Sequence, residues 1–114
     1  MRLKYSVKLS GLTPQIVLGA VIIADVYTSL DKNAICTITS ANDSIHSPKS
    51  LHYGREGKYT DGLCRALDFR THDFDGDKQQ LLHECKEALG PDFDVVLEAE
   101  GSPNEHLHVE YDPK

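Results

Sequence analysis

His52, Asp68 and a pair of histidines near the C-terminus have the side-chain types that bind metal ions together. His52 ends a polar loop, and Asp68 lies in the middle of an alternating segment beside the small side chain of Ala66. His106 and His108 are separated by one residue in a second alternating segment. Two imidazoles and one carboxylate are typical of a zinc site whose fourth position stays open for water, which is the catalytic type. These residues therefore predict a zinc centre with His52, Asp68 and one of the two C-terminal histidines.

The choice between His106 and His108 depends on how the last segment is built. On a regular strand both imidazoles and the carboxylate of Glu110 point to one side, while Glu105 points to the other. In that arrangement His106 could be the ligand, with Glu110 as a hydrogen-bonding partner behind it. Spacing alone leaves the two histidines as alternatives.

Several other ionisable side chains have structural interpretations. Asp68 could form a salt bridge with Arg65 or Arg70, and Glu105 could be a solvated loop carboxylate. Three further histidines fall in expected loops or on a helix surface, where we expect solvated side chains rather than ligands: His46, His72 and His83.

The order of three short motifs resembles the zinc D-alanyl-D-alanine carboxypeptidase family. That family shares its fold with the hedgehog signalling domain and with phage endolysins that cut peptidoglycan stem peptides. The motifs are Ser-x-His from Ser50 to His52, Ala-x-Asp ending at Asp68, and Glu-x-x-His from Glu105 to His108. The resemblance implies that His52, Asp68 and His108 bind zinc. It also implies that Glu105 is the catalytic base, which takes a proton from water and passes it to the leaving amine.

The spacing of the first two motifs departs from the family pattern. The family usually keeps the first histidine and the aspartate close together, with a glycine between them. Here His52 and Asp68 are 16 positions apart, and residues 54–62 (GREGKYTDG) stand between them. A loop can absorb such an insertion because added loop length costs little entropy. We expect the insertion to be exposed and to shape the cleft.

A second departure concerns the arginine with which many members polarise the substrate carbonyl. The corresponding segment, residues 39–43, contains no arginine. Lys49, Arg55 or Arg70 could replace it, and the sequence does not choose among them. The residues expected to bind substrate or to lie beside it are Ser50, Arg55, Arg70 and His106.

Two helices and several strands are expected to position these residues. Residues 13–30 begin with a Thr-Pro start signal and are nearly apolar all round, which predicts a mostly buried helix. Residues 77–89 are amphipathic and end at Gly90 followed by proline, which predicts a second helix. Strands are expected at residues 34–39, 63–70, 94–98 and 106–111, and residues 3–9 are expected to be a short strand or an extended lead-in. The order predicts a single α+β domain, residues 1–114, with a small, mostly antiparallel sheet packed against helices, and the resemblance implies the hedgehog/DD-peptidase-like fold.

Composition excludes some classes of partner. The net charge of the 114-residue chain is −6, and the acidic residues are spread along it. Nucleic acid is therefore not an expected partner, because phosphate binding needs a basic face. The apolar run at residues 16–24 is too short to span a bilayer, and we find no signal-peptide pattern. The odd number of cysteines, three without a CxxC pair, favours reduced, packed thiols, and we expect synthesis in a cytoplasm.

The functional expectation is a zinc metallopeptidase that hydrolyses peptidoglycan stem peptides. The D-Ala-D-Ala carboxypeptidase and the L,D-endopeptidase types remain alternatives for the bond that is cut. A phage lysis enzyme, made in the host cytoplasm and acting on the cell wall after release, would suit the small size. The alternative is a non-catalytic, zinc-binding hedgehog-like interaction module, such as a phage accessory or virion protein. A third interpretation is a metal-free α+β interaction domain.

Overall fold

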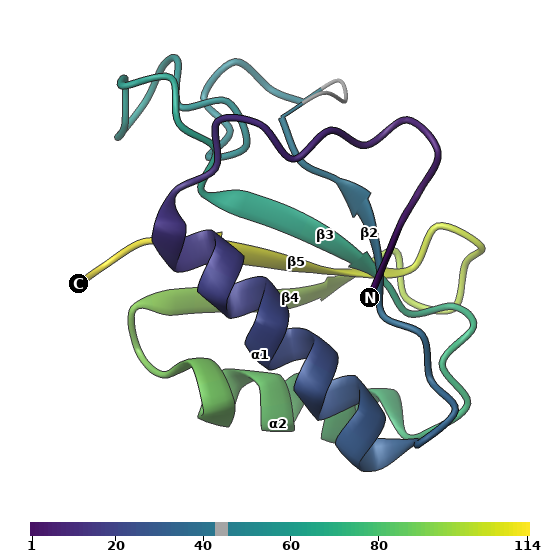
Figure 1. Cartoon of the computed structure of the whole chain (residues 1–114). Helices are drawn as coiled ribbons and strands as arrows, with labels where there is room; N and C mark the ends of the chain where they lie inside the picture. Colours follow the sequence, from purple (N-terminus) through teal and green to yellow (C-terminus); the bar gives the residue numbers. More distant parts are fainter. Residues whose placement is uncertain (43–45) are drawn as a thin grey trace.

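The computed structural model describes residues 1–42 and 46–114 of the chain (Figure 1). These residues form five strands and two helices in the order β1 (Arg2–Leu3), α1 (Pro14–Leu30), β2 (Thr37–Ser40), β3 (Ala66–Arg70), α2 (Lys78–Leu89), β4 (Phe93–Glu98) and β5 (His106–Tyr111). The segment that lacks an arginine is residues 39–43. Its last residue, number 43, lies outside the described residues.

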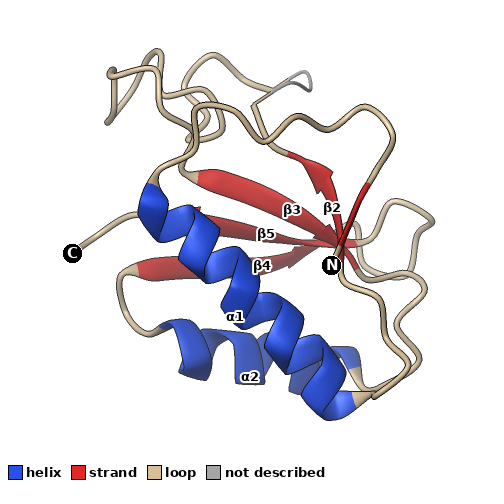
Figure 2. Cartoon of the chain, viewed as in Figure 1, coloured by secondary structure: helices blue, strands red, loops and turns tan. Residues whose placement is uncertain are grey.

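The strands form one sheet in the order β1-β2-β3-β5-β4. Strand β1 is parallel to β2, and the other three neighbouring pairs are antiparallel. Both helices lie against one face of the sheet (Figure 2), where α1 contacts β3 and β5, and α2 contacts β4. The α+β architecture with a mostly antiparallel sheet is confirmed. The finer likeness to the hedgehog/DD-peptidase fold stays a prediction.

Each helix begins after a capping residue, Thr13 as predicted for α1 and Asp77 for α2. Thr13 Oγ1 accepts a hydrogen bond from the backbone N–H of Ile16, and Pro14 follows it at the first helical position. Asp77 Oδ1 accepts hydrogen bonds from the N–H groups of Gln79 and Gln80, which starts α2. Gly90 ends α2 with a φ of 82°, a backbone conformation that glycine adopts without strain.

The first strand is much shorter than the alternation of residues 3–9 predicts. Only Arg2–Leu3 pairs with β2, and the chain then turns, with the N–H of Val7 donating to the carbonyl of Lys4. The side chain of Tyr5 is fully exposed, so the alternation there does not correspond to a buried sheet face. Of the two alternatives for residues 3–9, the strand through residue 9 was therefore wrong.

Helix α1 is also less buried than its composition predicts. Ile16 and Ile23 are fully buried against the sheet, whereas Val17, Leu18 and Val21 are 45%, 64% and 56% exposed. The reason is that α1 packs on the sheet and on α2, and its outer side faces away from both. In the described parts of the chain, no helix combines the length and the apolar character that crossing a membrane requires.

The register of β3 against β5 positions the predicted site. Asp68 lies directly opposite His108, and Arg70 lies opposite His106. The alternate residues of both strands, among them Leu67 and Leu107, are buried in the core beneath the helices. Because successive side chains of a strand point to opposite faces, Asp68 and His108 lie on the face away from the helices, which we call the open face.

Candidate metal centre

The three predicted ligands meet on the open face. His108 Nδ1 lies 2.8 Å from Asp68 Oδ1, and His52 Nε2 lies 3.4 Å from the same oxygen. One potential ligand atom from each residue lies within 4.8 Å of those of the other two. We call these residues the triad. Two of its members come from neighbouring strands, and His52 reaches them from the long loop between β2 and β3.

The loop that carries His52 is fixed by its own hydrogen bonds. The backbone N–H of His52 donates to Ser50 Oγ at 3.1 Å. The N–H of Arg65 donates to the carbonyl of Leu51 at 2.8 Å, which ties the loop to the residue before β3. The ring of His46 stacks on the ring of His52. As a result the imidazole of His52 is 1% exposed.

The buried ring of His52 needs a partner that the surrounding protein does not supply. Neither ring nitrogen of His52 forms a hydrogen bond with any residue that the structure describes, and the 3.4 Å approach to Asp68 is not aligned as one. Leaving a buried polar atom without a partner costs about 1–3 kcal/mol. A metal ion held between His52, Asp68 and His108 would remove that cost for Nε2, the ring nitrogen that faces Asp68. The donor set of two imidazoles and one carboxylate fits zinc by ligand type and accepts other divalent ions as well.

His108 lies between two carboxylates. Its Nδ1 contacts Asp68, and its Nε2 lies 2.8 Å from Glu110 Oε1. Burial alone would lower the pKa of His108, but the hydrogen bonds and charges of Asp68 and Glu110 outweigh it and raise this pKa to about 10. The ring is therefore an imidazolium unless a metal ion replaces one of its two protons. Burial alone would raise the pKa of Asp68, yet His108 and His52 hold it well below its usual value, so the carboxylate is ionised.

Glu98 is a fourth ionisable group against the triad. It lies directly opposite His106 across β4 and β5, with Glu98 Oε1 3.2 Å from His106 Nε2 and 3.8 Å from His108 Nδ1. Its side chain is 49% exposed, so this carboxylate lies at the solvent side of the cluster. Asp68, Glu98 and His106 form a second group whose potential ligand atoms lie within 4.8 Å of one another.

The distances also bear on the two C-terminal histidines. His106 Nε2 is 4.0 Å from Asp68 Oδ1, compared with 2.8 Å for His108 Nδ1. The other nitrogen of His106, Nδ1, lies 2.7 Å from the carbonyl oxygen of Asn104 and donates to it. The geometry therefore favours His108 as the triad member and places His106 beside it.

Glu105 does not join the triad. Its Oε1 accepts hydrogen bonds from Thr71 Oγ1 at 2.6 Å and Lys78 Nζ at 2.7 Å, and its Oε2 accepts one from the N–H of Gly101 at 2.9 Å. The carboxylate is 3% exposed, so the interpretation as a solvated loop residue was wrong. Glu105 shares its strand parity with the core residues Leu107 and Val109, which directs it away from the face that carries His108. The role of Glu105 as catalytic base stays a prediction. Three donors are already bound to its oxygens.

The remaining substrate-binding candidates lie in different places. Arg70 is on the open face, opposite His106, and lines a hollow beside it. The guanidinium of Arg55 lies 4.5 Å from the centre of the Tyr53 ring. The insertion at 54–62 forms no strand and closes where the N–H of Gly62 donates to the carbonyl of Gly54.

The alternative interpretation of Asp68, as the partner of an arginine, does not hold for the described residues. Arg65 instead forms two hydrogen bonds with Asp61, at 2.8 and 2.6 Å. The ion pairs of Asp68 among those residues are all with histidines.

Two side chains at the site were missed by sequence reasoning. His46, expected to be solvated, is partly buried against His52. Glu98 was assigned only to a strand. Glu98 lies near the triad because the register of β4 against β5 pairs it with His106. The signal available in the sequence was the alternation of β4, which puts Glu98 on one face with Asp94 and Val96.

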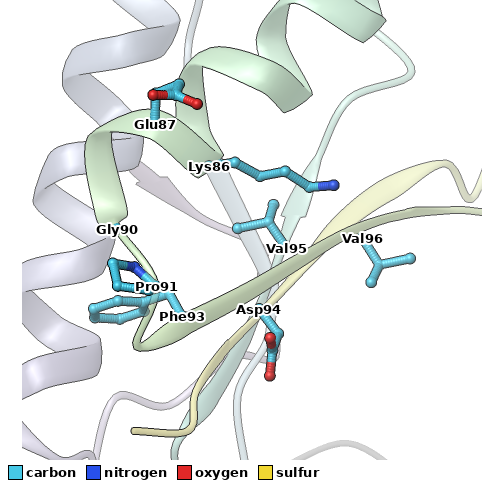
Figure 3. Close-up of a pocket in the computed structure, with 8 residues that line it drawn as sticks. All are labelled: Lys86, Glu87, Gly90, Pro91, Phe93, Asp94, Val95 and Val96. Atoms are coloured by element: carbon cyan, nitrogen blue, oxygen red, sulfur yellow. The ribbon is translucent and has the colours of Figure 1, made fainter. Parts of the chain in front are cut away.

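A larger hollow of the described structure lies away from the triad. It has a volume of about 740 Å³ and lies between the end of α2 and β4, where Lys86 and Glu87 stand near Asp94, Val95 and Val96 (Figure 3). Its lining contains no histidine or cysteine, and the residues with metal-binding side chains, Glu87 and Asp94, form no ligand group there. Size alone does not make it the functional site.

Comparison with known proteins finds no matching family model, no matching curated protein and no matching solved structure. The case for a metal centre therefore depends on the geometry of the triad.

Proposed function

We propose that the protein is a zinc-dependent metallopeptidase. The observation that supports this most directly is the meeting of His52, Asp68 and His108 within 4.8 Å, with a buried His52 ring that has no hydrogen-bonding partner among the described residues. Bound zinc would polarise the substrate carbonyl and lower the pKa of water to near 7. Asp68 and His108 are partly exposed, at 13% and 19%, so a substrate can approach them from the open face.

Glu98 is the carboxylate best placed for proton transfer. It is the most exposed group of the cluster and lies 3.8 Å from His108 Nδ1, whereas Glu105 is held by three donors. Glu98 would take a proton from the attacking water as the water oxygen bonds to the carbonyl carbon. It would then give that proton to the amine nitrogen as the C–N bond breaks. In this scheme Glu105, the base implied by the motif resemblance, has a structural role.

The proposed substrates are peptidoglycan stem peptides. This part rests on the three motifs that resemble the D-alanyl-D-alanine carboxypeptidase family. A lysis enzyme of a phage, made in the host cytoplasm and acting on the wall after release, is the corresponding biological setting.

A second candidate function is a zinc-binding interaction module without turnover, for instance a phage accessory or virion protein. The observation that favours it is the engagement of Glu105, the base expected from the motif, with Thr71, Lys78 and Gly101. If Glu98 does not take over its role, the triad would bind a metal ion and hydrolyse nothing.

Metal analysis combined with digestion of defined muropeptides tests these proposals. We expect about one zinc per chain, lost in His52→Ala and Asp68→Ala and retained in Asp94→Ala, an exposed carboxylate paired with Lys114. We expect muropeptide cleavage by the wild type, abolished by chelation. Zinc without any cleavage would select the interaction module. A purified protein without zinc after growth in zinc-replete medium would refute both proposals.

Two carboxylate variants then separate the candidate bases. We expect Glu98→Gln to reduce turnover by at least ~100-fold with zinc retained, the usual scale for a lost acid–base group. Glu105→Gln should keep turnover while losing stability. Glu100→Gln, a neighbouring exposed carboxylate, is the matched control. Loss of turnover in Glu105→Gln with full activity in Glu98→Gln would return the role of base to Glu105.

A further inference from the structure

A second set of metal-binding side chains lies beside the triad and shares one member with it. Asp68, Glu98 and His106 each offer a ligand atom within 4.8 Å of those of the other two. Glu98 and His106 lie directly opposite each other on β4 and β5, and Asp68 comes from β3. Neither Glu98 nor His106 belongs to the triad. Three neighbouring strands therefore bring a second mixed group of imidazole and carboxylates together on the open face.

The ring of His106 is oriented as that of a metal ligand. Its Nδ1 lies 2.7 Å from the carbonyl oxygen of Asn104, so Nδ1 carries the proton of this hydrogen bond. A backbone carbonyl that accepts from one ring nitrogen fixes the tautomer and leaves the lone pair of the other nitrogen for a metal ion. That other nitrogen, Nε2, lies 3.2 Å from Glu98 Oε1. Because a lone pair and a carboxylate oxygen repel each other, a proton or a metal ion has to lie between them.

The separations of the ligand atoms fit a small divalent cation. Ligand atoms bound at roughly 2.0–2.1 Å to a tetrahedral ion lie roughly 3.3–3.4 Å from one another. His106 Nε2 is 3.2 Å from Glu98 Oε1, which matches this value. The same nitrogen is 4.0 Å from Asp68 Oδ1, which exceeds it by about 0.6 Å. One imidazole and two carboxylates accept zinc, manganese or cobalt by ligand type.

Asp68 can serve both sites, because a carboxylate has two oxygens and one can bind each ion. Ions that share ligands in two-metal sites lie about 3.5–4 Å apart, and at that distance their positive charges repel each other. Arg70, opposite His106 on β3, adds a further positive charge to this side of the sheet. The side chain of Glu98 is 49% exposed, so water competes for this ion more than at the buried His52. We therefore expect the triad to fill first and the second site to fill only when the metal is in excess.

We propose that Asp68, Glu98 and His106 form a second, weaker divalent-cation site whose occupation inhibits the enzyme. The site itself rests on the geometry of the open face, and the inhibition rests on the proposed peptidase function. Glu98 is the carboxylate proposed to take a proton from the attacking water. A carboxylate bound to a divalent cation is a much weaker base, because the charge of the ion disfavours protonation. The concentration of the metal ion therefore sets the fraction of active enzyme.

Zinc titration of the metal-free protein counts the ions. With a chromogenic chelator as competitor, we expect two ions per wild-type chain, the second bound at least ~10-fold more weakly than the first. His106→Gln and Glu98→Gln should each lose the weaker ion and keep the tighter one. The exposed positions of His83 on α2 and Glu100 after β4 provide matched controls, and His83→Gln and Glu100→Gln should keep both ions. One ion in the wild type, or two in both His106→Gln and Glu98→Gln, would overturn the second site.

Long-range ¹H–¹⁵N NMR spectra of the imidazole rings identify the ligands without a variant and without turnover. The first equivalent of zinc should shift ring nitrogens of His52 and His108. The second equivalent should shift Nε2 of His106, while Nδ1 stays protonated and bound to the carbonyl of Asn104. The exposed ring of His83 should respond to neither equivalent. A second equivalent that leaves His106 Nε2 unshifted would refute the site.

Turnover at two zinc concentrations tests the inhibition. Muropeptide cleavage by the wild type should fall at least ~10-fold between one equivalent of zinc and saturation of the second site, because an acid–base group is lost. His83→Gln should show the same fall. In His106→Gln the ratio of the two rates should stay within about twofold, since the second ion no longer binds. Two bound ions with equal turnover at both concentrations would overturn the inhibition.

The binding and turnover results together separate this inference from the proposed function. Cleavage by a protein that binds one ion only would overturn the second site and leave the peptidase function standing. Two bound ions without any cleavage at either zinc concentration would support the second site and refute the peptidase proposal.

Discussion

The imidazole of His46 lies flat against the imidazole of the buried His52, with 3.7 Å between the ring centroids and 5° between the ring planes. His46 Nε2 lies 2.9 Å from Ser40 Oγ and 3.1 Å from the carbonyl oxygen of Ala41, so its ring is held at the end of β2. His52 is the one triad member that comes from a loop. The stack therefore holds the His52 ring in position beside the two triad members that come from strands.

This relationship predicts that His46 supports metal binding without being a ligand. His46→Ala should lower zinc affinity by roughly 10–100-fold, the usual effect of removing a group that orients a ligand. His46→Phe, which keeps a flat ring against His52, should recover most of the loss. Competition with a chromogenic chelator measures the affinities. Equal losses in the two variants would show that the imidazole itself, rather than the stack, is required.

Glu110 is predicted to orient His108 in the same way. Its Oε1 lies 2.8 Å from His108 Nε2, on the opposite side of the ring from Asp68. A carboxylate behind a ligating histidine fixes the ring and makes it a better donor. Glu110→Ala should therefore weaken zinc binding about tenfold or more. The cross-strand neighbour Asp94 offers a matched control, because Asp94→Ala removes a carboxylate that pairs with Lys114 instead. Similar affinities for the two variants would contradict the assignment.

The elements that position the site could be predicted largely from local signals. The caps at Thr13 and Asp77 place the starts of both helices, and the glycine at position 90 places the end of α2, because capping depends on residues close in sequence. The alternation in β3 and β5 correctly separates Asp68 and His108 from the core residues between them. In these parts of the fold, the residues of one short segment are enough to predict its secondary structure and which of its side chains are buried.

What could not be predicted depends on contacts between distant segments. The stack of His46 on His52 requires the loop after β2 to fold back on itself, and no periodicity encodes that closure. Glu98 reaches the triad only because β4 pairs with β5 in one particular register. The base was assigned to Glu105 from a motif. Lys78, from the first position of α2, binds that carboxylate across a gap of 27 residues, which a motif cannot reveal.

The Glu105 network predicts an acid-sensitive contribution to stability. Burial alone would raise the pKa of Glu105, but the hydrogen bonds from Gly101, Lys78 and Thr71 outweigh it and lower this pKa to about 2. A carboxylate with a lowered pKa in the folded state stabilises the fold above its unfolded pKa, near 4.5, and loses this effect as the pH falls toward 2. The contribution that disappears over this window is roughly 3 kcal/mol.

Urea unfolding between pH 7 and pH 2 measures this contribution. At pH 7, Glu105→Gln should lower the free energy of unfolding by roughly 3 kcal/mol, and the difference from wild type should shrink as the pH drops below 4.5. Glu84→Gln, an exposed carboxylate on α2, should change stability by less than about 0.5 kcal/mol. A Glu105→Gln difference that stays constant with pH would rule out the ionised carboxylate as its source.

The three cysteines are predicted to be unreactive in the folded protein. Cys36, Cys64 and Cys85 are thiols and not disulfides, and their exposed fractions are 2%, 0% and 0%. Burial raises the pKa of Cys36 and of Cys85 to about 12, so neither is a thiolate near neutral pH, and the thiolate is the reactive form. Reaction with a disulfide reagent at pH 8 should therefore be slow in buffer and should reveal three thiols once guanidinium unfolds the chain. Val96→Cys, at a position that is 50% exposed on β4, supplies a positive control that should react at once. Rapid modification of the wild type in buffer would mean that the core around α1 and α2 opens far more often than its packing indicates.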